Sequence, residues 1–209
     1  MSEKRESFLR KAEQLASLIY EKMHELRSKP MKDVGLGSLL SIFKLKADVD
    51  EGKDMEEGLS SLAPKIYEVI LFGSVAAGKK EPSDIDLMIL DNGHFSNFFP
   101  CMTAEHHTED AYEDLEDNLL WLMDGWFSVS ELQLQEILRD TTVDLHVLPL
   151  KLLRSPELRK KIAEKHKDPN FLRNAFGTAL RFDRFDRKFE PLTLEYLEKR
   201  YNCRLDDLR

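Results

Sequence analysis

Two aspartates stand one residue apart inside an otherwise apolar run, residues 84–90 (DIDLMIL). A continuous apolar run of this length is typical of a buried strand, and alternate residues of a strand lie on the same face of a sheet. Asp84 and Asp86 are therefore expected side by side, with Ile85 and Leu87 turned toward the core. Neighbouring carboxylates repel each other unless a cation neutralises them, and hard divalent ions such as Mg²⁺ or Mn²⁺ prefer oxygen ligands. The pair predicts a metal site.

Gly73 and Ser74 precede this pair by a spacer of nine residues. A glycine lets the backbone approach a bulky anion, and a serine at a helix start offers its hydroxyl and its N–H to phosphate oxygens. These two residues are predicted to seat a triphosphate facing the metal site. Lys79 and Lys80, within the spacer, are either point charges that bind phosphate or two solvated loop lysines.

A third acidic candidate, Asp144, stands inside the short apolar run 142–148 (TVDLHVL). This run predicts another strand, which would bring a further carboxylate to the sheet. The distance along the chain is large, since 57 residues separate Asp144 from Asp86. Asp91 and Asp140 are the competing acids, but both positions are typical of strand ends or loops.

Three histidines and one glycine-rich stretch are weaker candidates. His146 lies two residues after Asp144, so it either approaches the metal site or is a hydrogen-bonded histidine with no catalytic part. His106 and His107 stand among acids and indicate a solvated helix start better than a metal site, because adjacent residues rarely point at one ion. The stretch 35–38 (GLGS) follows no strand pattern and indicates a plain turn rather than a phosphate loop.

The elements that must position these residues follow from the periodicity. Apolar residues recur at three- and four-residue steps over 5–28, which predicts an amphipathic helix ended by Pro30. A β-branched and aromatic run at 66–72 predicts a strand, followed by the strands at 84–90 and 142–148. These elements predict an α/β (α+β) fold, a small mixed β-sheet flanked by helices.

The remainder, 151–209, is predicted to be a helical segment. Ser155-Pro156 and Asp168-Pro169 have the form of helix starts, with a cap followed by proline, and Thr193 is expected to cap a last helix. Between them, the basic residues of 181–188 alternate with phenylalanines. This stretch is expected to form an amphipathic helix with ion pairs along it, the other possibility being a basic strip for a phosphate or RNA.

The block 71–90 (LFGSVAAGKKEPSDIDLMIL) resembles the nucleotidyltransferase superfamily that includes DNA polymerase beta, and most closely its small prokaryotic members, the minimal nucleotidyltransferases. The resemblance implies that Asp84 and Asp86 hold two metal ions and that Asp144 completes the site and helps to activate the attacking hydroxyl. The chain departs from the family in its long insertion before Asp144. It also lacks an arginine that many small members carry shortly before the loop glycine Gly78.

The resemblance implies the transfer of a nucleoside monophosphate, AMP from ATP in the first instance, to a hydroxyl of a small molecule or protein, with release of pyrophosphate. The alternative is a nucleotide-binding antitoxin or regulatory module of the same fold, which acts by contact with a partner such as a toxin. The core is expected at residues 60–150, between an N-terminal helical region at 1–59 and the helical segment at 151–209.

Composition limits the partners and the compartment. The 209 residues carry a formal net charge of −8, although residues 151–209 hold 16 basic and 10 acidic side chains and so are net positive. The acidic charge argues against nucleic acid as a partner, because phosphate contacts need an excess of Lys and Arg. No signal peptide or membrane-spanning run is evident. Two cysteines without metal-site spacing suit a reducing, cytoplasmic environment.

Overall fold

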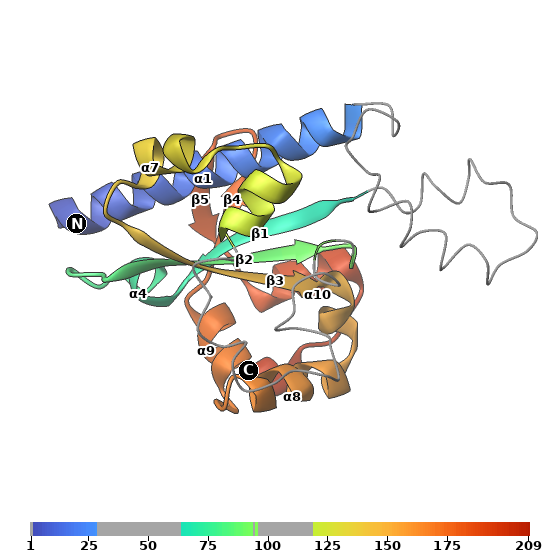
Figure 1. Ribbon diagram of the computed structural model, residues 1–209. Helices are drawn as coiled ribbons and strands as arrows, with labels where there is room; N and C mark the ends of the chain where they lie inside the picture. The colour runs from blue at the N-terminus through green and yellow to red at the C-terminus, as the bar shows by residue number, and fades with distance from the viewer. Residues whose placement is uncertain (1, 29–63, 94, 96–118) are drawn as a thin grey trace, which may run out of the picture.

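A computed structural model describes residues 2–28, 64–93, 95 and 119–209. Its centre is a five-stranded mixed sheet in the order β3-β2-β1-β4-β5 (Figure 1). Strand β1 pairs antiparallel with β2 and β4, β2 pairs parallel with β3, and β4 pairs antiparallel with β5. The strands are β1 (Ile66–Phe72), β2 (Asp84–Asp91), β3 (Thr142–Pro149), β4 (Leu180–Asp183) and β5 (Lys188–Pro191). The predicted fold class is confirmed.

One face of the sheet is covered by the long helix α1 (Glu3–Ser28), which lies over the strands (Figure 1). The sequence predicts this helix over 5–28. Its apolar side is buried, and Ala12, Leu15 and Ile19 have no exposed area. The π-helical turn η3 (Trp121–Trp126) and helix α7 (Glu131–Leu138) contribute to the same apolar cluster. Ser130 and Gln133 form a capping box at the start of α7.

Three helices cover the opposite face: α8 (Pro156–Lys165), α9 (Phe171–Gly177) and α10 (Leu194–Tyr201). Ser155 and Thr193 cap α8 and α10 as predicted, each side chain accepting a bond from the backbone N–H three residues on. The predicted helix start at Asp168-Pro169 is wrong. There, the Asp168 carboxylate accepts a bond from the Asn170 N–H and closes a turn, so α9 begins only at Phe171. The 3₁₀ turns η4 (Leu150–Arg154) and η5 (Asp206–Leu208) complete this layer.

The helix expected over 181–188 is also wrong, because these residues form the β4–β5 hairpin. Phe182 faces Phe189 across the two strands, and their rings meet edge to face. At the turn, the Asp183 carboxylate accepts bonds from two backbone N–H groups, which stabilises the chain reversal. Arg181 forms ion pairs across the strands with Glu190 and along its own strand with Asp183, rather than along a helix. The alternation of charged and aromatic residues therefore belongs to a strand of period two.

Two of the weaker candidates fall outside the described residues: the GLGS stretch at 35–38 and the His106-His107 pair. The domain limits at 59 and 150 stay predictions. Within the described part of the chain, no helix combines the length and the apolar character needed to cross a bilayer.

Candidate active site

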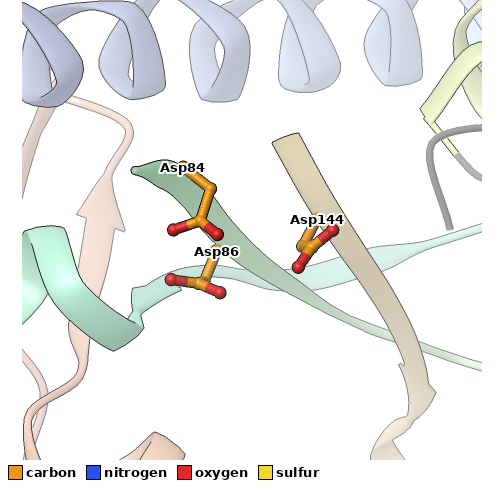
Figure 2. A group of neighbouring side chains, drawn as sticks. All are labelled: Asp84, Asp86 and Asp144. Atoms are coloured by element: carbon orange, nitrogen blue, oxygen red, sulfur yellow. The ribbon is translucent and has the colours of Figure 1, made fainter. Parts of the chain in front are cut away.

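The three predicted aspartates meet at one edge of the sheet. Asp86 is the register partner of Asp144 on β3, and Asp84 lies two residues earlier on β2. One carboxylate oxygen from each residue lies within 4.8 Å of the other two. In Figure 2 the three side chains converge and point away from helix α1. The strand pairing, with its period of two, places all three on the same face, which is the reason for the convergence.

The electrostatics of this cluster favour a bound cation. Burial, followed by the charges of Asp84 and Asp144, raises the pKa of Asp86 from 3.8 to about 6, although a bond from the Ser74 N–H and the charge of Lys79 oppose the rise. Three half-buried carboxylates at this separation repel one another when ionised. An all-oxygen donor set of this kind is the chemistry that Mg²⁺ or Mn²⁺ prefers. The residues present therefore fit a divalent metal.

Gly73 makes the closest approach to the acidic cluster. It directly follows β1, begins the short helix α4 (Gly73–Ala76) and has a φ of +66°, a conformation that glycine adopts at little cost. A Cβ added at this position would lie 1.9 Å from Oδ2 of Asp86. No other residue type fits this turn without displacing the Asp86 carboxylate. The glycine of the motif is thus required by a close approach to the site as well as by backbone conformation.

Ser74 contributes a polar atom without a partner. Its Oγ is buried, and it is one of two such side-chain atoms in the described part of the chain that have no hydrogen-bond partner. Leaving a buried hydroxyl unpaired costs about 1–3 kcal/mol, so such atoms often mark ligand sites. A phosphate oxygen would supply the missing partner, which is the chemistry expected of this residue from the sequence.

The two loop lysines differ in their surroundings. Both are exposed, but the charge of Lys79 acts on Asp86, whereas no comparable effect involves Lys80 among the described groups. The backbone carbonyl of Lys80 accepts a bond from the Ser2 hydroxyl. Lys79 is therefore the better placed of the two for an anion at the aspartates.

The start of α1 holds this loop, which the sequence motifs did not indicate. Arg5 Nε donates to the carbonyl oxygen of Val75 at 2.9 Å, and Lys4 forms an ion pair with Glu81 at 3.4 Å. The Arg5 guanidinium also lies near Gly78, about 4 Å from a Cβ added there. Residues some 70 positions apart in sequence carry no periodic signal of such a contact, so only the folded chain reveals it.

The competing acids lie apart from the cluster. Asp91 ends β2 and is buried, and its carboxylate accepts a bond from the Phe95 N–H at 2.6 Å. Asp140 is exposed between α7 and β3. His146 does lie on the face of Asp144, but its ring packs against Phe72 and its Nδ1 is the second buried atom without a partner. Burial, with a smaller contribution from the charge of His166, lowers the pKa of His146 to about 3.

The comparison with known families agrees with this geometry. Residues 53–168, more than half of the chain, match the model of the nucleotidyltransferase domain family. The chain belongs to the nucleotidyltransferase domain family, so the resemblance inferred from the block 71–90 is confirmed. The matched residues include Gly73, the pair Asp84 and Asp86, and Asp144. No curated protein and no solved structure matches the chain.

Proposed function

We propose that this protein is a metal-dependent nucleotidyltransferase that moves a nucleoside monophosphate, AMP from ATP, to a hydroxyl group and releases pyrophosphate. The single observation that carries the proposal is the meeting of Asp84, Asp86 and Asp144 within 4.8 Å, beside a glycine turn that only a residue without Cβ can form. Family membership supports nucleotidyl transfer in general. The choice of ATP as the donor and of a hydroxyl group as the acceptor goes beyond family membership and is proposed here.

Asp84 and Asp86 would hold the metal with Asp144, and bound divalent cations would supply positive charge for the developing alkoxide and for the departing pyrophosphate. The protein itself positions the groups. Ser74 offers its unpaired Oγ to a phosphate oxygen, and Lys79 brings a positive charge toward the same region. Catalysis by this arrangement depends on orientation and electrostatics, without a covalent protein nucleophile.

The reaction would proceed by direct displacement. The acceptor oxygen forms a bond to the α-phosphorus while the bond from that phosphorus to the bridging oxygen breaks. Pyrophosphate leaves with the bonding electron pair. The proton of the acceptor hydroxyl passes to a carboxylate, and Asp144 is the residue that we assign to this role, because β3 presents it across the cluster from the Gly73 turn.

The acceptor that we propose is a small molecule or a protein. The net charge of −8 opposes a long phosphate backbone, although it leaves single hydroxyl groups unaffected. In the hairpin, Arg181 pairs with Glu190 and Arg187 pairs with Glu21, so part of its positive charge is neutralised. These ion pairs further disfavour a strong RNA surface.

The decisive experiment offers the protein ATP, GTP, CTP and UTP, each labelled on the α-phosphate, with Mg²⁺ and a cell extract. The proposal expects label to move from ATP to an acceptor, together with release of pyrophosphate. The double variant Asp84→Ala, Asp86→Ala is the control and should transfer nothing. Absence of transfer and of pyrophosphate release from every nucleotide would contradict the proposal and favour the antitoxin or regulatory module.

A further inference from the structure

Four rings from separate elements gather on the sheet face that carries the aspartates. Phe72 ends β1, His146 lies on β3, His166 follows α8, and Phe171 begins α9. We call them the ring cluster. The ring centroid of His146 lies 5.5 Å from that of Phe72, 5.2 Å from that of His166 and 5.4 Å from that of Phe171. His166 and Phe171 are stacked, with centroids 3.8 Å apart and an angle of 12° between the rings.

The ring cluster borders the acidic site directly. Phe72 is the register partner of Asp86 and immediately precedes Gly73. His146 follows Asp144 by two residues and therefore occupies the same face of β3. The two rings approach each other from the strands on either side of β2, next to Asp86. A ligand that has its phosphates at the aspartates and extends along this face of the sheet would meet the cluster.

Two features distinguish the ring cluster from ordinary core packing. His146 is 7% exposed, yet its Nδ1 has no hydrogen-bond partner. His166 and Phe171 are only half-buried, so their stacked pair keeps ring surface at the solvent boundary. Packing alone requires neither feature, because aliphatic side chains fill a core without an unpaired polar atom. Both are suited to a ligand that has a flat apolar surface and a polar edge.

We propose that the ring cluster binds the nucleobase of the donor nucleotide, which stacks on the His166–Phe171 pair and pairs a polar edge atom with Nδ1 of His146. This inference rests on the proposed function and adds the recognition of the base to it. The four side chains of the cluster include no carboxylate, amine or guanidinium, which favours an uncharged planar group. A nucleotide with its α-phosphate at the aspartates carries such a group one ribose away.

The test compares two probes that differ in the base. Mg²⁺-ATP and Mg²⁺-tripolyphosphate are titrated calorimetrically into the unaltered protein and into Phe171→Ala. Base stacking on a protein ring is worth enough that Phe171→Ala should weaken Mg²⁺-ATP about 10-fold or more. The affinity for Mg²⁺-tripolyphosphate should stay within about 2-fold, because that probe lacks the base. Phe171→Tyr retains the ring and should restore most of the affinity for ATP.

Phe185→Ala is the matched control, since Phe185 is a 97% exposed ring at the hairpin turn and should affect neither probe. Phe171→Leu keeps apolar bulk at the start of α9 and should still separate the two probes if Phe171→Ala unfolds. Equal losses for both probes, or unchanged binding of ATP, would overturn the assignment of the base. Binding of neither probe by the unaltered protein would instead overturn the proposed function, and this inference with it.

Discussion

On β2 and β3, the face toward α1 is apolar, whereas the opposite face begins with acids. Ile85, Leu87 and Leu145 lie on the α1 face and have no exposed area. Asp84, Asp86 and Asp144 alternate with such residues and are only half-buried. The same strands thus supply a dry core on one side and a polar site on the other.

The difference shows how one sheet serves stability and chemistry together. Farther along the acidic face, Met88 and Leu90 are buried under the C-terminal helices. On this face, the side chains of β2 are therefore fully buried only beyond the aspartates. Near the starts of β2 and β3, water and ligands can reach the carboxylates. An acid on the α1 face would be buried without room for a metal or a substrate, at a high desolvation cost. Partial coverage of one face is the feature that makes the site possible.

The largest expected effect of a single substitution comes from Asp144→Asn, which removes a charge from the acidic face and hardly changes volume. Under the proposed mechanism, transfer should fall by at least ~100-fold, because the proton acceptor and a metal ligand are lost together. The affinity for Mg²⁺-ATP should change little. Labelled-nucleotide kinetics and calorimetry measure the two quantities.

Asp140→Asn is the matched control for this change, since Asp140 lies close in sequence but is exposed outside the cluster. Full activity in Asp144→Asn, or an equal loss in Asp140→Asn, would place the third carboxylate elsewhere. A protein that releases no pyrophosphate in any form would instead fit the module that acts by partner contact.

A second test uses two glycines with positive φ. Gly73→Ala directs a methyl group into the Asp86 carboxylate and should weaken Mg²⁺-ATP by at least ~10-fold relative to Gly78→Ala. Gly78→Ala carries similar backbone strain, but its Cβ meets nothing nearer than the Arg5 guanidinium at 3.9 Å. Comparing the two variants by calorimetry and thermal melts therefore separates the close contact from the strain. Equal affinities would show that the Gly73 turn does not adjoin the nucleotide.

The pH dependence of stability should reveal the repulsion on the acidic face. The pKa of Asp86 is raised to about 6 from its ordinary value of 3.8. Between pH 3.8 and pH 6 the carboxyl group is therefore protonated in the native state but ionised in the unfolded state. Its contribution to stability is present below pH 3.8 and is lost as the pH rises through 6. Asp86→Asn cannot ionise, so its free energy of unfolding should not show this loss. In EDTA, the free energy of unfolding of Asp86→Asn relative to that of the unaltered protein should therefore rise by about 1 kcal/mol from pH 4 to pH 7, a value discounted for partial exposure.

Urea unfolding at a series of pH values measures this difference, and millimolar Mg²⁺ should reduce it by neutralising the carboxylates. A difference in the free energy of unfolding that does not vary with pH would show that the raised pKa of Asp86 is not its cause. A gap that Mg²⁺ leaves unaltered would argue against metal binding by the cluster.

The smallest expected effect separates the two loop lysines. Lys79→Ala should raise the KM for Mg²⁺-ATP about 3- to 5-fold, because an exposed charge near the phosphates contributes modestly. Lys80→Ala should leave the KM unchanged, since no described interaction links its ammonium to the aspartates. Steady-state kinetics at two salt concentrations measures both variants, and the Lys79 effect should shrink at the higher salt. Equal effects of the two variants would contradict a specific role of Lys79 in phosphate binding and favour the alternative that both are solvated loop lysines.

Prediction from sequence succeeded where the signal was local. The apolar period of α1 and the continuous apolar run of β2 are each contained within a few turns or residues, and both elements lie where they were expected. The β4–β5 hairpin was missed, because its stretch of arginines and phenylalanines satisfies a helical period as well as a strand period. Pairing of Ile70 with Arg181 along the β1 edge stabilises the strand conformation, and this partner is more than a hundred residues away.

The sequence by itself determined the side-by-side pair Asp84 and Asp86, the glycine turn before them and the family, because each depends on residues within one strand and one loop. Tertiary structure decided that Asp144 joins the pair, that Ser74 Oγ stays unpaired and that the ring cluster borders the site. These features depend on the parallel pairing of β2 with β3 and on the C-terminal layer folding back over the sheet. Contacts between distant segments form when apolar surface is buried across the whole chain, so no short stretch of sequence specifies them.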